Sequence, residues 1–198
     1  DQLTSLRIEK KYRIERFFND RILDINLVSQ SKDVQNILSL LGDKEQGYDT
    51  DKLIYDEYDK FLQKHFISGN YYKRFFVVNK EGKVVYFNAS DTDSLKQHRA
   101  LVGNLLISNL WKEILEEPEI LIEDYKLDTF TNLPAIYVGA PVYDTLNRTE
   151  GIIAIEVDID AINSIMFESN PHNGLGKSGE SYLVGSDYLM RSTSRFQD

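Results

Sequence analysis

The 198-residue sequence contains no cysteine, which excludes a disulfide framework, a cysteine-ligated zinc site and a thiol nucleophile. Its only histidines, His65, His98 and His172, lie far apart in the chain and lack the spacing of metal-ligand pairs. Basic residues are fewer than acidic ones, with 23 lysines and arginines against 32 aspartates and glutamates, so the net charge is −9. Nucleic-acid binding needs a basic face that neutralises phosphates, so this composition argues against it and also disfavours binding to anionic lipid.

Long apolar runs are missing too. No run approaches the roughly 18 consecutive apolar residues of a membrane span, and no signal peptide is present. The sequence also lacks the G-x-S-x-G motif of a serine nucleophile, and its many carboxylates form no recognisable catalytic pattern. We therefore expect this segment to have no enzymatic activity and to carry no cofactor or metal.

A GxGxxG pattern at Gly174, Gly176 and Gly179 is the feature that most resembles a nucleotide-binding motif. A dinucleotide fingerprint needs a strand before the glycines and a helix after them, so that the pyrophosphate meets a helix N-terminus. Here the order is reversed, because Asp160–Met166 has the pattern of a helix and Ser181–Gly185 that of a strand. The glycines are therefore predicted to form a turn between a helix and a strand.

The spacing of apolar residues predicts helices and strands in an order typical of one fold class. The expected helices are residues 1–41 (as one long helix or two), 53–66, 91–117 and 160–166, and the expected strands are residues 72–78, 83–87, 119–127, 135–143 and 151–159. This order predicts an α+β fold, in which a long N-terminal helix and shorter helices pack on the faces of an antiparallel five-stranded sheet.

Residues 174–196, GLGKSGESYLVGSDYLMRSTSRF, resemble the junction between the two sensor modules of double Cache domains. Residues 131–166 resemble the last two strands of the membrane-distal module, and residues 75–87 resemble its first hairpin, whereas residues 88–117 match no known pattern. The resemblance implies a PAS-like Cache fold. It also implies a stalk helix at residues 1–50, a distal sensor module at 51–170, and a junction with the first strands of a truncated or reduced proximal module at 171–198.

Double Cache domains are extracytoplasmic parts of bacterial and archaeal chemoreceptors and sensor histidine kinases. The resemblance therefore implies a periplasmic small-molecule sensor whose parent chain is anchored in the membrane and carries a kinase or chemotaxis output. Both ends of the sequence are expected to be boundaries within that longer chain. In the resembled family the N-terminal helix pairs with a second protomer, so a homodimer is expected. From the residues alone, an amphipathic helix packed on its own domain is the alternative.

Alternation along residues 151–159 predicts two unlike strand faces. Four apolar residues share the face expected to pack on the long helix: Ile153, Ile155, Val157 and Ile159. The other face carries Glu156 and Asp158, and buried carboxylates are costly unless they are paired. The resemblance implies that small ligands bind on this second face and that Glu156 grips the ligand's amino group. The alternatives are an ion pair with Arg74 or solvation for Glu156, and a helix-capping role for Asp158.

Aromatic and basic residues on neighbouring strands extend the candidate site. Tyr137 shares a face with the small residues Ala135 and Gly139, which suits either a pocket or a core tyrosine. On the first hairpin, period-two alternation predicts that Tyr72 and Arg74 share a face. Arg74 could clamp a ligand carboxylate with two hydrogen bonds, although a solvated arginine is the alternative.

Trp111, the only tryptophan, follows a helical pattern with Leu110 and Ile114, so it is predicted either to pack in the core or to line the pocket. Amino-acid-binding relatives carry an R-x-W-Y pattern in this region, where this chain has Asn109-Leu110-Trp111-Lys112. The missing arginine disfavours the usual grip on an α-amino acid. The remaining acids and aromatics favour a ligand that carries an amine or a positive charge.

Two other classes of function stay open at this point. One is a structural or dimerisation module that signals through a protein partner and whose sheet face is filled by its own side chains. The other is an intracellular PAS-like domain that holds haem or flavin. It is disfavoured because there is no cysteine for a flavin adduct and no histidine in the predicted pocket strands.

Overall fold

The computed structural model describes residues 2–42, 52–65, 71–90, 102, 108–128, 133–167, 175, 178–194 and 196. The chain divides into two compact units. Unit 1 consists of Asp1–Arg21 and Asp158–Asp198, and unit 2 consists of Ile22–Val157.

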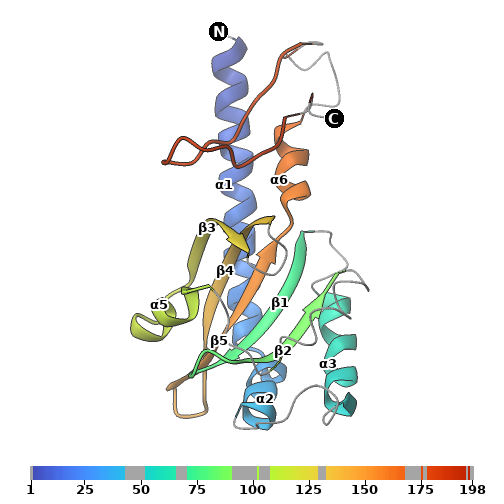
Figure 1. The fold of residues 1–198 in the computed structure, drawn as a ribbon, viewed down its shortest axis with the longest axis vertical. Coiled ribbons are helices and arrows are strands. Elements are labelled where there is room, and N and C mark those ends of the chain that lie inside the picture. Colours follow the sequence, from blue (N-terminus) through green and yellow to red (C-terminus); the bar gives the residue numbers. More distant parts are fainter. Residues whose placement is uncertain are drawn as a thin grey trace. The chain divides into compact units, whose positions relative to one another are not determined.

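The helices and strands follow the predicted order (Figure 1). Within the described residues the helices are α1 (Gln2–Ser29), α2 (Lys32–Leu41), α3 (Lys52–His65), α5 (Leu110–Glu116) and α6 (Ile159–Met166). The strands are β1 (Tyr72–Asn79), β2 (Val84–Ala89), β3 (Leu121–Asp128), β4 (Leu133–Tyr143) and β5 (Thr149–Val157). The α+β prediction is confirmed. The predicted N-terminal helix is two helices, because Ser31 caps α2 by accepting a hydrogen bond from the Val34 amide at 3.3 Å.

Unit 2 contains a five-stranded sheet in the order β2-β1-β5-β4-β3, with every neighbouring pair antiparallel. Strand β5 lies at its centre and is buried from Gly151 to Val157. A central strand is covered on both faces, which explains why it is apolar almost throughout. A charged side chain on β5 must therefore find its partner inside the protein.

One face of the sheet carries α2 and the part of α1 that belongs to unit 2. A Cβ added at Gly151 would meet the Leu38 side chain of α2 at 2.9 Å, so this helix approaches β5 closely. Tyr72, the cross-strand partner of Val157, donates a hydrogen bond to Asp24 of α1 at 2.5 Å. The predicted apolar face of β5 therefore packs as expected, except that Ile159 lies beyond the strand and belongs to α6.

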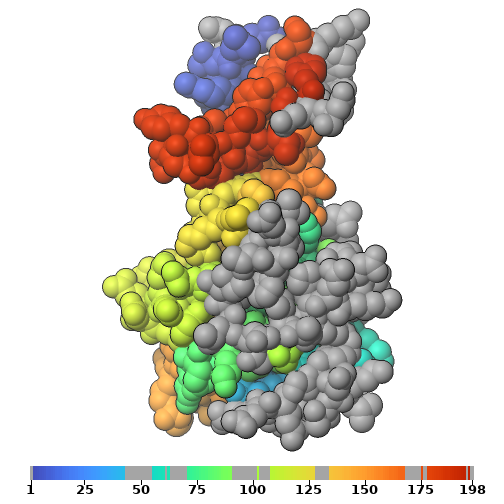
Figure 2. All heavy atoms as spheres, in the orientation of Figure 1, coloured from blue at the N-terminus to red at the C-terminus, as the bar shows by residue number. Residues whose placement is uncertain are grey.

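The opposite face of the sheet is covered in part by α5. Buried apolar residues from β1, β2, β4, β5 and α5 form one core cluster there, which includes Phe76, Phe87, Ala154, Leu110 and Ile114. In Figure 2 the yellow-green spheres of α5 lie beside the green spheres of the β1–β2 turn. The Trp111 ring fits against Gly82 in that turn, where an added Cβ would lie 2.4 Å from the ring.

Unit 1 joins the N-terminal half of α1 to α6 and the C-terminal segment. The Lys10 side chain of α1 is buried and donates hydrogen bonds to the carbonyl oxygens of Ile165 and Met166, at 2.8 and 3.1 Å. Ser181 donates to the same Met166 carbonyl at 2.8 Å. A lysine at a helix C-terminus satisfies carbonyls that have no partner within the helix, so Lys10 fixes the end of α6 to α1.

The predicted strand Ser181–Gly185 is wrong, because that segment forms only one isolated bridge, between Val184 and Met190. A tight turn closes the bridge, with the Gly185 amide donating to the Leu189 carbonyl at 2.9 Å. A strand requires a partner along its length, and sequence pattern alone does not supply one. The predicted turn at the GxGxxG pattern is seen in part. The Gly179 amide donates to the Leu175 carbonyl at 2.9 Å, whereas Gly174 and Gly176 lie outside the described residues.

None of the helices in the described ranges has the length and the apolar character that crossing a membrane requires.

Candidate functional site

A row of five residues crosses the sheet on the face that carries α5. Cross-strand pairing places Ala89, Arg74, Glu156, Tyr137 and Glu123 side by side, one from each strand in the order β2, β1, β5, β4 and β3. Residues that pair across strands project to the same face of a sheet. The sequence-predicted candidates Arg74, Glu156 and Tyr137 are therefore brought together. This set is called the charged row below.

The centre of the charged row is a buried ion pair. The Arg74 Nε donates to the Glu156 carboxylate, and the two side chains are only 1% and 6% exposed. The Arg74 Nη2 also donates to the Tyr137 hydroxyl at 3.2 Å. Of the alternatives for Glu156, solvation is excluded in this structure and the ion pair with Arg74 is present. Deep burial makes the charge on each side chain strongly dependent on the other.

Aromatic rings surround the ion pair. The Arg74 guanidinium lies 5.9 Å from the centre of the Phe76 ring, and that ring meets Tyr137 edge-on at 6.0 Å. The space predicted beside Tyr137 at Gly139 is filled, because an added Cβ there would lie 2.6 Å from Leu110 and 2.7 Å from Ile114. The absence of a side chain at Gly139 allows helix α5 to pack closely against β4, so this space is not available to a ligand.

Glu123 belongs to the charged row and was not identified from the sequence. It is buried, accepts a hydrogen bond from the Ser108 hydroxyl at 2.5 Å and forms an ion pair with Lys126. Period-two alternation along Leu121, Glu123 and Tyr125 could have placed Glu123 on the same face as its alternate neighbours. The strand is irregular between Glu123 and Lys126, so the alternation does not continue along its whole length and is a weak signal in the sequence.

Tyr72 lies on the opposite face of the sheet from the charged row, so the prediction that it shares a face with Arg74 is wrong. The cause is a β-bulge, because Tyr72 pairs with Val157 while Arg74 pairs with the adjacent Glu156. The extra residue, Lys73, reverses the alternation of side chains. Tyr72 therefore reaches Asp24 of α1 and not the candidate site.

Tyr72→Phe should lower the free energy of unfolding by about 1–2 kcal/mol, since it leaves the Asp24 carboxylate without one charge-assisted hydrogen bond. The measurement is urea unfolding followed by circular dichroism. Tyr143→Phe, in the partly exposed end of β4, serves as the matched control and should change stability by less than about 0.5 kcal/mol. Equal stability of both variants would contradict the face assignment of Tyr72.

Asp158 and Trp111 do not join the charged row. Asp158 is the N-cap of α6, and its carboxylate accepts a hydrogen bond from the Asp160 amide at 3.0 Å, the capping role considered above. Trp111 is partly buried against Gly82 and the core cluster, and the Lys112 ammonium lies 5.4 Å from its ring centre. Both side chains thus have structural contacts, and their predicted part in ligand binding stays a prediction.

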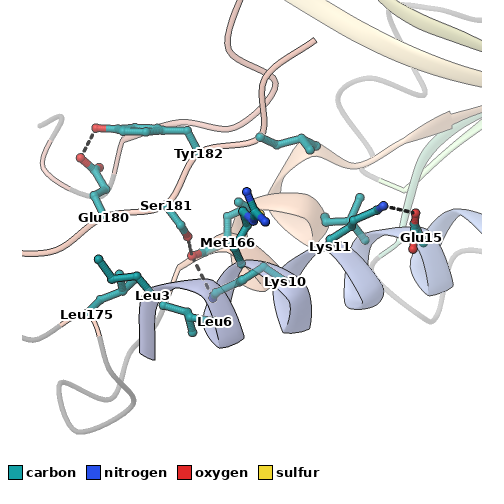
Figure 3. Close-up of a pocket in the computed structure, with 13 residues that line it drawn as sticks. Leu3, Leu6, Lys10, Lys11, Glu15, Met166, Leu175, Glu180, Ser181 and Tyr182 are labelled. Carbon is teal, nitrogen blue, oxygen red and sulfur yellow. Dashed lines mark hydrogen bonds and ion pairs between the residues drawn. The ribbon is translucent and has the colours of Figure 1, made fainter. Parts of the chain in front are cut away.

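Unit 1 contains a separate hollow of about 470 Å³ (Figure 3). Its walls come from the N-terminal half of α1, the end of α6, Leu175 and residues 180–183, and they include Leu3, Leu6, Ile14, Met166 and Leu183. Arg7, Lys11, Glu15 and Glu180 place charges of both signs around it. The sequence did not reveal this hollow, because its walls lie far apart in the chain.

In the part of the chain that the structure describes, no three histidine, aspartate or glutamate side chains gather in a group that could hold a metal ion.

The sequence matches no protein-family model and no curated protein. Solved structures, in contrast, resemble the chain over most of its length. The sensor domain of the Vibrio cholerae histidine kinase DctB aligns with a TM-score of 0.64 at 12% identity, covering 84% of this chain and 58% of that domain. The ligand-binding domain of the Campylobacter jejuni chemoreceptor Tlp3, in complex with 4-methylisoleucine, aligns with a TM-score of 0.57 at 12% identity, covering 96% and 70%.

A third similar structure is the ligand-binding domain of the Pseudomonas fluorescens chemoreceptor CtaA in complex with L-serine, with a TM-score of 0.54 at 14% identity, covering 93% of this chain and 67% of that domain. The chain has the fold of these sensor domains. The resemblance to Cache-type sensors is thereby confirmed at the level of the fold. These neighbours are named as sensor or ligand-binding domains.

Proposed function

We propose that this chain is the extracytoplasmic small-molecule-sensing part of a transmembrane receptor of the histidine kinase or chemotaxis type. The observation that carries the proposal is the buried Arg74–Glu156 ion pair on the sheet face opposite α1 and α2. Ion pairs in a protein interior contribute little net stability, so a buried pair near the centre of the sheet favours a binding role. The sensor fold supports the same conclusion.

The proposed organisation follows the resemblance. Residues 1–50 form the stalk, residues 51–170 the distal sensor module, and residues 171–198 the junction to a proximal module. We propose that the N-terminal helix pairs with a second copy of the chain. Five large apolar side chains on α1 are at least 59% exposed and support this pairing: Leu3, Ile8, Tyr12, Leu23 and Leu27. A second copy would cover them.

The ion pair also restricts the chemistry of the ligand. A purely cationic ligand at Glu156 would compete with Arg74 for this carboxylate and weaken the buried ion pair. A purely anionic ligand at Arg74 would compete with the Glu156 carboxylate in the same way. Either outcome is costly in a dry interior. A ligand with both an ammonium and an anionic group keeps both side-chain charges compensated. Its ammonium replaces Arg74 as the partner of Glu156, and its anionic group replaces Glu156 as the partner of Arg74.

We therefore propose a zwitterionic ligand whose ammonium meets Glu156 and whose anionic group meets Arg74. This refines the sequence-based expectation of an amine-bearing ligand, and it assigns to Arg74 on β1 the role that an arginine near Trp111 plays in the resembled amino-acid sensors. The ligands named for the Tlp3 and CtaA structures, 4-methylisoleucine and L-serine, are zwitterions of this class.

A thermal-shift screen with matched ligand sets tests the proposal. Each set contains an amino acid, the amine formed by removing its carboxylate, and the acid formed by removing its amine. At 100 times its dissociation constant the correct zwitterion should stabilise the chain by about 2.7 kcal/mol, or roughly 5–10 °C in the melting temperature, while its two partial analogues have little effect. A shift produced by a simple amine as large as that of its parent zwitterion would contradict the proposed ligand class.

The second candidate is a structural or dimerisation module that signals through a protein partner. The specific observation in its favour is that Arg74 and Glu156 already compensate each other within the sheet. It predicts no melting shift with any member of the ligand sets, together with a dimer whose stability depends on protein concentration.

A further inference from the structure

A second ion pair lies on the same sheet face as the Arg74–Glu156 pair, at the edge strand β3. Glu123 is the cross-strand partner of Tyr137, which in turn pairs with Glu156. Two strand spacings of about 4.8 Å each therefore separate the backbones of the two glutamates, roughly 10 Å in all. Lys126 forms an ion pair with Glu123. Glu123 and Lys126 together are called the outer pair below.

A β-bulge in β3 brings the two members of the outer pair to one face of the sheet. Glu123 and Lys126 are three residues apart, and in a regular strand such residues point to opposite faces. Their partners on β4, Tyr137 and Ala135, are only two residues apart, so β3 holds one extra residue between Glu123 and Lys126. Bulges of this kind are common beside binding sites, where they redirect a side chain. Here the bulge turns Lys126 to the face of the charged row.

The two members of the outer pair differ in their exposure to water. The Glu123 side chain is 8% exposed, whereas the Lys126 side chain is 56% exposed. Glu123 also accepts a hydrogen bond from the Ser108 hydroxyl, and the Ser108 oxygen accepts one from the Leu110 amide at 3.0 Å, where α5 begins. The Glu123 carboxylate is therefore held in place from two elements, while the Lys126 ammonium lies near water.

This difference decides which kind of ligand group suits the outer pair. An added cation would replace the Lys126 ammonium, and the released lysine would cost little because most of its side chain already meets water. An added anion at Lys126 would instead compete with the buried Glu123 carboxylate for its cation, and weakening that interaction is costly away from water. The outer pair therefore favours a cationic group.

We propose that Glu123 is a second cation-binding position, which makes the charged row selective for amino acids with an amine-terminated side chain. The inference rests on the proposed zwitterion site at Arg74 and Glu156, and it adds the chemistry of the ligand's side chain. The ligand's α-ammonium meets Glu156, its carboxylate meets Arg74, and its side-chain ammonium replaces Lys126 at Glu123. No covalent bond forms or breaks.

The separation of the two glutamates matches the length of such a ligand. Three extended main-chain bonds cover about 3.3–3.6 Å, so the six bonds between the two nitrogens of L-lysine span roughly 7 Å. Each nitrogen binds its carboxylate oxygen at about 2.8 Å. Two carboxylates on backbones roughly 10 Å apart are therefore within reach of both ends. The methylene stem would cross Tyr137, the residue between them in the charged row, and such stems pack readily on apolar surface.

Isothermal titration calorimetry of the wild-type chain with three L-amino acids tests the inference. L-norleucine keeps the α-ammonium and the carboxylate of L-lysine and lacks only its terminal ammonium. We expect L-lysine to bind at least about tenfold more tightly than L-norleucine, the effect of one hydrogen-bonded ion pair. L-lysine that binds no more tightly than L-norleucine, or less tightly than L-glutamate, would overturn the inference.

Three substitutions separate Glu123 from general attraction by an acidic chain. Glu123→Gln keeps an oxygen that can accept from Ser108 but removes the charge, so the ratio of the L-norleucine to the L-lysine dissociation constant should fall to about one. Asp124→Asn, the matched control, removes the same charge at the next and exposed position of β3 and should keep the wild-type ratio. Lys126→Gln should raise the ratio, because the ligand no longer competes with this lysine. A ratio that E123Q does not change, that D124N lowers equally, or that K126Q lowers would overturn the inference.

The outcomes also distinguish this inference from the proposed function. Equal affinity of the wild-type chain for L-lysine and L-norleucine would leave the zwitterion site in place and remove only the role of Glu123. A failure of all three amino acids, and of every zwitterion in the thermal-shift screen, would overturn both. The comparison of ligands on the wild-type chain does not depend on how well the Glu123→Gln variant folds.

Discussion

Glu156→Leu should lower the free energy of unfolding by about 3–5 kcal/mol, because it leaves the buried Arg74 guanidinium without its carboxylate. Arg74→Met should have an effect of similar size. The double variant Arg74→Met/Glu156→Leu should recover most of the stability, since it removes both buried charges and replaces them with apolar side chains of similar volume. Urea unfolding of the four proteins, analysed as a double-mutant cycle, measures the interaction energy.

The exposed pair Arg148–Asp144 provides the control for this cycle. Its arginine side chain is 73% exposed, so water and salt screen the interaction, and Arg148→Met should cost less than about 1 kcal/mol. A loss below 1 kcal/mol for Glu156→Leu as well would mean that the ion pair is solvated and that the buried charged row does not exist as described.

Gly151→Ala should lower the free energy of unfolding by up to about 3 kcal/mol. The added Cβ would lie 2.3 Å from the Val78 backbone oxygen, and that oxygen cannot retreat without opening the pairing of β1 with β5. Gly139→Ala is the matched control, because its Cβ would meet only the ends of the Leu110 and Ile114 side chains, which can rotate away.

Thermal unfolding of these two variants compares a Cβ that would clash with backbone, at Gly151, with a Cβ that would clash with side chains, at Gly139. Gly139→Ala should lower stability by clearly less than Gly151→Ala. Equal losses would contradict the close approach of Val78 to Gly151 at the centre of the sheet.

The α+β architecture could be predicted from the sequence because its signals are local. The apolar alternation of residues 151–159 and the helical spacing of residues 53–66 each require only neighbours in the chain. Ser181–Gly185 shows the limit of such signals. It has the composition of a strand, yet a strand exists only where another segment pairs with it, and the described structure supplies one bridge.

The candidate site was predictable in part for the same reason. Alternation predicts which side chains share a face with Glu156 on its strand and with Arg74 on its strand. It does not predict that β1 and β5 are neighbours in the sheet, because that pairing joins segments far apart in the chain. A single extra residue, Lys73, moved Tyr72 to the opposite face, and no composition signal marks that bulge. Glu123 was missed because the irregularity in β3 breaks the alternation that identifies it.

The measurement that tests the central claim most directly is isothermal titration calorimetry of the zwitterion selected by the thermal-shift screen, against wild type and the Arg74→Met/Glu156→Leu variant. The variant keeps its fold because both buried charges are removed together, so a change in affinity reports on binding alone. The account predicts at least about a 100-fold loss of affinity, since the ligand's two charges would then be buried without partners. Equal affinity for the two proteins would contradict it.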